Sequence, residues 1–163
     1  MQICHSFDHL AHVLSHNMAH AFKHNVEQAL EELGEQTKAE IESRIGNYPQ
    51  NQGKSPAWQQ LSDDTIRQKK KKGWGLNGNA NSPLYASGAF AKSIGTDRSG
   101  TKFVVIGTNV DYIRYTEMGT AKMPARPVFQ PSADYVIAKM LPRIQQLSAA
   151  GVVAEPVTHL VIK

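Results

Sequence analysis

Histidine is the residue type whose spacing most directly suggests chemistry in this sequence. Six histidines follow one another at intervals of three or four residues near the N-terminus, namely His5, His9, His12, His16, His20 and His24. Imidazoles four residues apart project from the same side of a helix, so two of them can hold one zinc or nickel ion. A structural metal site normally takes three or four ligands, however, and the only acid among these histidines is Asp8. We therefore favour a solvated polar face, with a pH-responsive subunit contact and metal binding as alternatives.

Basic residues gather in a second stretch, which comprises Arg67, Lys69, Lys70, Lys71 and Lys72. Ser62 or Asp63 can cap a short helix that carries them and that ends before Gly73. Lysines in the last turn of a helix also suit its dipole, so a solvated helix end is the first interpretation. The alternative is contact with the phosphates of DNA or with an acidic partner.

The other reactive side chains do not form a catalytic set. The carboxylates of Glu31-Glu32, Asp63-Asp64 and Glu117 are adjacent in sequence or embedded in charged helix surface, and no Ser-His or Cys-His pair follows from spacing. Cys4 is the single cysteine and cannot form an internal disulfide. We expect a protein that is not an enzyme and that uses no cofactor or metal.

The strongest constraint on the backbone comes from Tyr112–Ser132, with the sequence YIRYTEMGTAKMPARPVFQPS. A short amphipathic piece runs into Gly119, which can take the positive φ that ends a helix. Two prolines then fix their own φ and push the preceding residues toward extended conformations, so Met123–Phe129 is predicted to be an extended arm. Pro131-Ser132 opens another apolar-periodic segment. The window therefore predicts a rigid elbow between two helices.

We expect this elbow to form an interface, because its prolines lower the entropy lost on docking and because arginine and aromatic residues dominate interfaces. Tyr112, Tyr115 and Met118 are predicted to hold the short helix to the sheet. Arg126 is expected to pair either with Glu117 across the elbow or with a group of a neighbouring subunit, which we favour. The alternative is that Pro-Ala-Arg-Pro only positions the C-terminal helix on its own subunit. The expected contacts to a neighbouring subunit or protein are Tyr112, Tyr115, Glu117, Gly119, Met123, Pro124, Arg126, Pro127 and Phe129.

Read as Y-x-x-Y-x-E-x-G-T-x-K-M-P-A-R-P-x-x-x-P, the window resembles the signature of the head-tail connector and tail completion proteins of long-tailed phages and prophages. Two further blocks stand in the expected order. They are Trp58-x-x-Leu61-Ser62-x-x-Thr65 with Lys69 following, and Leu84-Tyr85-Ala86-Ser87-Gly88-Ala89-Phe90-x-x-Ser93-Ile94. Where the family usually has Thr-Gly-x-Leu-x-x-Ser-Ile, this chain keeps the turn with a bulkier apolar anchor, Phe90. The resemblance spans Ala57 to Ala133.

The resemblance implies a structural virion protein of the phage neck, a ring-forming head-tail connector or tail completion protein that joins the tail to the DNA-filled head. It implies a homo-oligomeric ring, other neck and tail proteins as partners, non-specific contact with DNA, and assembly in the bacterial host cytoplasm. The alternative from the residues alone is a small nucleic-acid-binding protein that uses Lys69–Lys72 and Trp74.

Composition agrees with one soluble globular domain. The 163 residues are 40% hydrophobic and 20% charged, with a mean hydropathy of −0.41. No apolar run approaches the roughly 20 residues that span a bilayer, and the N-terminus has no secretory signal pattern, so we expect no membrane contact. A net charge of +4 is mild for a dedicated DNA-binding domain.

The hydrophobic period changes from 3.6 to 2 and back along the chain. Ser6–Arg44 is predicted to be one long helix or two in line, and Ala133–Ser148 a second helix with Pro142 inside it. Lys102–Thr108 is the clearest strand and is predicted to pair with Ser93–Thr96 as a hairpin. We predict an α+β fold with a long N-terminal helix and a C-terminal helix packed on a small antiparallel β-sheet.

The long N-terminal helix carries two apolar faces. Phe7, Leu10, Leu14, Met18 and Ala21 share one face, and Phe22, Val26, Leu33, Thr37 and Ile41 share another that is rotated by about a third of a turn. Either the helix bends near His20–Asn25, or its first half packs on a neighbouring subunit, which we favour. The single domain then divides into a helical region 1–47, a loop-rich region 48–83 with a mobile Gly73–Pro83 loop, the family core 84–151, and a tail or edge strand 152–163.

Overall fold

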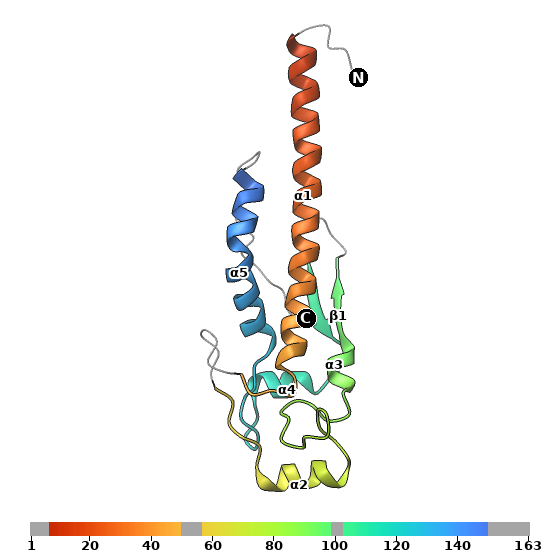
Figure 1. Cartoon of the computed structure of the whole chain (residues 1–163), viewed down its shortest axis with the longest axis vertical. Helices are drawn as coiled ribbons and strands as arrows, with labels where there is room; N and C mark the ends of the chain where they lie inside the picture. Colours follow the sequence, from red (N-terminus) through yellow and green to blue (C-terminus); the bar gives the residue numbers. More distant parts are fainter. Residues whose placement is uncertain (1–6, 50–56, 99–102, 150–163) are drawn as a thin grey trace.

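The computed structural model describes residues 7–49, 57–98 and 103–149, and for residues 7–18, 21 and 147–149 it describes the backbone alone. The fold is the predicted α+β fold, with a two-stranded antiparallel sheet packed beside the long N-terminal helix (Figure 1). In chain order its elements are α1 (Phe7–Arg44), α2 (Asp63–Lys71), α3 (Ala89–Ser93), β1 (Ile94–Asp97), β2 (Val105–Thr108), α4 (Ile113–Met118) and α5 (Phe129–Ala149).

Helix α1 is continuous over its 38 residues, including His20–Asn25, where a bend was one of two alternatives. Both α5 and the β1–β2 hairpin pack along its C-terminal part, while its N-terminal part projects beyond them (Figure 1). Gly34 lies at the contact with the hairpin, where a Cβ would stand 2.9 Å from the Val104 Cγ2 atom. A side chain at this position would therefore push the hairpin away from α1.

The hydrophobic core lies where α1, α3, the hairpin and the first turns of α5 meet. Phe90, the bulky anchor noted in the sequence, is buried there with its ring centroid 6.4 Å from that of Phe129. Gly88 makes this placement possible, since it precedes α3 with a φ of 82°. The buried core comprises Leu33, Ile41, Ile45, Trp58, Phe90, Ile94, Val104, Ile106, Val128, Phe129, Val136 and Met140.

The predicted hairpin is confirmed, although its second strand is shorter than expected. Ile94 pairs with Thr108 at one end of the ladder and Asp97 with Val105 at the other. Phe103 lies before β2 and is exposed, although it was predicted to belong to the strand. The run of strand-forming residue types is therefore longer than the segment that pairs with β1.

The predicted cap of α2 is also confirmed, because Ser62 Oγ accepts a hydrogen bond of 3.3 Å from the Thr65 amide. The following loop, which was predicted to be mobile, contains hydrogen bonds of its own and one to α2. The Trp74 amide donates to the Lys69 carbonyl at 2.9 Å, and Ser82 Oγ donates to the Asn79 carbonyl at 2.7 Å. Ser82 is fully buried, so the loop packs against the body.

The segment 152–163 and His5 lie outside the described residues, as do the side chains of His9, His12 and His16. His20 and His24 are exposed on α1. Within the described ranges, no three His, Cys, Asp or Glu side chains gather closely enough to hold a metal ion. None of the helices in those ranges is long and apolar enough to cross a membrane.

Candidate assembly surface at α4 and the elbow

The elbow begins with a tight turn after α4. Gly119 ends the helix with a φ of 74°, as predicted, and a Cβ there would come within 2.8 Å of the Ala125 backbone nitrogen. The Thr120 amide then donates to the Met123 carbonyl at 2.8 Å, and the Met123 amide donates back at 3.2 Å. Only glycine fits a turn that is both left-handed and this close to the returning chain.

The extended arm is shorter than predicted. Residues 124–128 have no regular structure, but α5 begins at Phe129 rather than at Pro131. The carboxylate of Glu117 explains the earlier start, because its Oε1 accepts hydrogen bonds from the Val128 amide at 2.7 Å and the Phe129 amide at 3.2 Å. A negative group at the first amides of a helix also suits the helix dipole. Glu117 therefore fastens α4 to the start of α5.

Burial raises the pKa of the Glu117 carboxyl group, and the hydrogen bonds from Val128 and Phe129 oppose that shift. Desolvation is the larger of these effects. The Glu117 carboxyl group thus stabilises the contact between α4 and the start of α5 within the subunit, and its protonation state affects that contact.

The ion pair between Glu117 and Arg126, one of the two expected alternatives, does not form. Arg126 is 6% exposed, and its Nη2 donates to the Gln59 carbonyl at 3.0 Å while its backbone amide donates to the Thr116 carbonyl at 2.6 Å. Arg126 turns toward the segment before α2, whereas Glu117 turns toward α5. Gln59, which the sequence analysis missed, contributes only a backbone carbonyl and so leaves no side-chain signal.

The structure also corrects the predicted role of Lys69. Its side chain is buried, and its ammonium group donates to the Ser82 carbonyl. Burial, and secondarily the nearby positive charge of Arg126, lowers the pKa of Lys69. Lys69 is therefore removed from the candidate contacts with DNA or an acidic partner. The remaining members of the run, Arg67, Lys70, Lys71 and Lys72, are exposed.

The outer face of α4 is the clearest exposed apolar surface near the elbow. Tyr112, Tyr115 and Met118 recur every third residue and are 48%, 47% and 74% exposed. They were predicted to hold α4 to the sheet, but Ile113 makes the contact with the core instead. The guanidinium of Arg114 lies 5.2 Å from the centroid of the Tyr115 ring. We call Tyr112, Arg114, Tyr115 and Met118 the α4 face.

The other predicted interface residues divide by exposure. Pro124 is exposed, and Met123 and Pro127 are half-buried. Phe129 lies in the hydrophobic core. Arg114 was not predicted, although a basic residue beside Tyr115 in a short helix was a usable signal.

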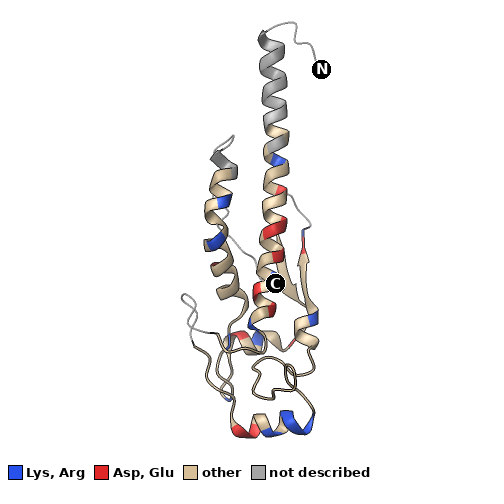
Figure 2. Ribbon diagram, in the orientation of Figure 1, with Lys and Arg blue, Asp and Glu red and all other residues tan. Residues whose placement is uncertain are grey.

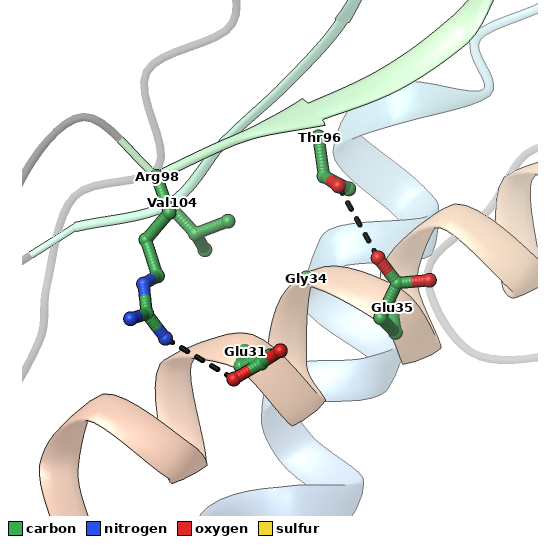
Figure 3. Close-up of a pocket in the computed structure, with 6 residues that line it drawn as sticks. All are labelled: Glu31, Gly34, Glu35, Thr96, Arg98 and Val104. Atoms are coloured by element: carbon green, nitrogen blue, oxygen red, sulfur yellow. Dashed lines mark hydrogen bonds and ion pairs between the residues drawn. The ribbon is translucent and has the colours of Figure 1, made fainter. Parts of the chain in front are cut away.

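A small hollow between α1 and the hairpin has a volume of about 130 Å³ (Figure 3). Its polar side chains are already paired: Arg98 Nη1 donates to Glu31 Oε2 at 3.2 Å, and Thr96 Oγ1 donates to Glu35 Oε1 at 3.2 Å. Ligand pockets are usually larger, at about 300–1,000 Å³. The hollow is therefore the seam between two packed elements.

Charge is distributed unevenly over the molecule (Figure 2). Acidic residues lie along α1, and the basic run lies at the C-terminal end of α2. At that end Lys72 Nζ stands 4.3 Å from the centroid of the Trp74 ring.

The chain matches no family model, no curated protein and no solved structure at a significant level.

Proposed function

We propose that this protein is a structural virion protein of the phage neck, a ring-forming component that joins the tail to the DNA-filled head. The observation that carries the proposal is that some residues of the Tyr112–Ser132 window make contacts within the subunit while others are exposed to solvent. Glu117, Gly119 and Arg126 build the elbow inside the subunit. The tyrosines and methionine of the α4 face are left in solvent.

Those exposed side chains are of the types that interfaces favour. Tyrosine, methionine and arginine are enriched at protein contacts, and arginine and tyrosine are over-represented among the residues that contribute most binding energy. The α4 face belongs to a helix that is held in place by the turn at Gly119 and by the contact of Glu117 with α5. A surface held in this way loses little conformational entropy when a partner binds it. The proposal assigns the α4 face to a neighbouring neck subunit or neck protein.

The proposal does not include catalysis. Glu117 binds the first amides of α5, and Glu31 and Glu35 bind Arg98 and Thr96 across the hairpin seam. These carboxylates have structural partners, so they are poor candidates for acid–base work.

The test is complementation of a phage or prophage that lacks this gene. We expect heads and tails to accumulate unjoined without the gene, and wild-type protein to restore joining, as counted by electron microscopy. A Tyr115→Ser/Met118→Ser variant should fold normally but restore joining poorly. Phe103→Ser is the matched control, because Phe103 is an equally exposed aromatic residue on the hairpin. Joined particles in the absence of the gene would refute the proposal.

Binding to nucleic acid is a second candidate, favoured by the stacking of Lys72 on Trp74 beside the exposed Lys70 and Lys71. Aromatic and cationic side chains together suit single-stranded or non-specific binding. A Lys70→Gln/Lys71→Gln/Lys72→Gln variant should then lose DNA affinity and show a weaker dependence on salt. Equal affinity and salt dependence in the variant and the wild type would exclude this site.

A further inference from the structure

Two cationic side chains, one from α2 and one from the elbow, are buried in the same part of the molecule. Lys69 is 8% exposed and Arg126 is 6% exposed. Each binds a backbone carbonyl, because the Lys69 ammonium group donates to Ser82 and Arg126 Nη2 donates to Gln59 at 3.0 Å. We call Lys69 and Arg126 the buried cation pair.

The two carbonyls belong to segments that contact each other. Asn81 Nδ2 donates to Gln60 Oε1 at 3.4 Å, which joins the segments right beside those carbonyls. The Tyr48 hydroxyl joins them again, because it donates to Asn81 Oδ1 at 2.8 Å and accepts a hydrogen bond from the Leu61 amide at 3.0 Å. The two members of the buried cation pair are therefore anchored on neighbouring parts of one hydrogen-bonded region.

No acidic side chain balances these two charges within the described part of the chain. Burial, and secondarily the positive charge of Arg126, lowers the pKa of Lys69, and no described carboxylate opposes that shift. A buried charge without a counter-charge is strongly unfavourable, and two like charges make it more so. The ion pairs of the described residues involve other arginines, namely Arg44, Arg67, Arg98 and Arg143.

Two buried N–H groups in this region also lack an acceptor. Arg126 Nε and Trp58 Nε1 are buried and have no hydrogen-bond partner among the described residues. Trp58 immediately precedes Gln59, whose carbonyl Arg126 holds. Buried polar atoms are nearly always hydrogen-bonded, so unpaired donors beside uncompensated positive charge point to an acceptor that is itself negatively charged.

We propose that the buried cation pair binds a small tetrahedral dianion of the sulfate or phosphate class. The charges match, because one lysine and one arginine together supply two positive charges. The planar fork of arginine and the point charge of lysine both suit the oxygens of such anions. Both side chains keep a little exposed surface, so the anion can reach them from solvent. This anion site is independent of the neck function proposed above.

The test is equilibrium dialysis of the full-length chain against radiolabelled sulfate at constant ionic strength. We expect saturable binding at a single site, with displacement by inorganic phosphate and not by chloride. Lys69→Met removes one charge and keeps an apolar stem, so it should abolish this binding. Lys70→Gln/Lys71→Gln/Lys72→Gln is the matched control, because these lysines are exposed, and it should bind sulfate as the wild type does.

Arg126→Lys keeps the test decisive if Lys69→Met does not fold. This variant retains the charge and loses the planar fork, so we expect sulfate affinity to fall about tenfold or more. In parallel, the melting temperature of the wild type should rise by several degrees as sulfate is added and then level off. Sodium chloride at the same ionic strength should not reproduce that rise.

Dimethyl phosphate separates a dianion from the DNA backbone, because it carries the single negative charge of a phosphodiester. It should fail to displace sulfate, and displacement as ready as that by phosphate would overturn the assignment to a dianion. Loss of binding in the triple lysine variant would place the anion on the exposed basic run and overturn the buried site. An absence of saturable sulfate binding in the wild type, or unchanged affinity in Arg126→Lys, would also overturn it.

Discussion

At the scale of single residues, Glu117 is the group whose replacement best separates charge from hydrogen bonding. Glu117→Gln keeps an oxygen acceptor for the Val128 and Phe129 amides and removes a desolvated charge. We expect its melting temperature to equal or exceed that of the wild type. Glu117→Ala leaves both amides without this acceptor and should cost about 1–3 kcal/mol. Thermal melts of the two variants at neutral pH give the comparison.

The raised pKa of Glu117 also predicts how the stability of the folded protein depends on pH. Its pKa in the folded state is raised above its ordinary value of 4.5, so the folded state binds the proton more tightly than the unfolded state. The stability that this group contributes is complete below pH 4.5 and is lost as pH rises through the raised pKa. The stability difference between Glu117→Gln and wild type should therefore grow with rising pH across that window. A constant difference would contradict the assignment.

Arg126 is expected to matter for stability of the isolated chain, which reverses the expectation of a partner in a neighbour. Its guanidinium is buried and holds the Gln59 carbonyl, so Arg126→Ala removes a packed side chain and leaves that acceptor unpaired. We expect the melting temperature to fall by several degrees. Arg114→Ala is the matched control, because Arg114 is exposed and its guanidinium contacts the side chain of Tyr115. Similar melting of the two variants would contradict this role.

At the scale of elements, the contact of α1 with the hairpin depends on Gly34. Alanine is a better helix former than glycine by about 1 kcal/mol, so propensity alone predicts stabilisation by Gly34→Ala. The new Cβ would stand 2.9 Å from the branched Val104 side chain, however, and such overpacking costs about 1–3 kcal/mol. We expect net destabilisation in denaturant melts, partly relieved by adding Val104→Ala. Gly95→Ala, which meets no atom within 4 Å, should be neutral.

Mutations of the buried and of the exposed lysines at the basic end of α2 should have different effects on stability. Lys69→Ala removes a buried stem and the donor to the Ser82 carbonyl, so we expect a loss of about 1–3 kcal/mol. Lys70→Gln/Lys71→Gln/Lys72→Gln changes exposed groups and should stay within about 0.5 kcal/mol. Chemical denaturation of both variants measures their free energies of unfolding and checks this difference. Equal losses would mean that the exposed lysines also carry fold stability.

At the scale of the whole molecule, self-association should show in the melting of the protein. If copies associate in the proposed ring, the native state is favoured by mass action, and the melting temperature should rise with protein concentration. A Tyr115→Ser/Met118→Ser variant should weaken this rise while melting at the temperature of dilute wild type, because both side chains are exposed in the single chain. Melting that is independent of concentration in the wild type would argue against association.

Several elements could be read from the sequence because their signals are local. The period of the apolar residues predicted α1, α5 and the hairpin. A cap at Ser62 or Asp63 and the stop at Gly119 were predicted from single residue types. Such signals depend on the conformations of neighbouring residues, which side-chain chemistry constrains directly. The α+β fold class follows from the order of these elements.

Only the tertiary structure decided how the elbow residues are used. Arg126 meets Gln59 across 67 positions of sequence, and Glu117 meets Val128 across 11, so no local spacing predicts either partner. In a helix as short as α4, the apolar residues Tyr112, Ile113, Tyr115 and Met118 cover several directions, and the pattern cannot say which direction meets the core. Packing left Ile113 inside and the two tyrosines and Met118 outside, because burial depends on what lies opposite each face.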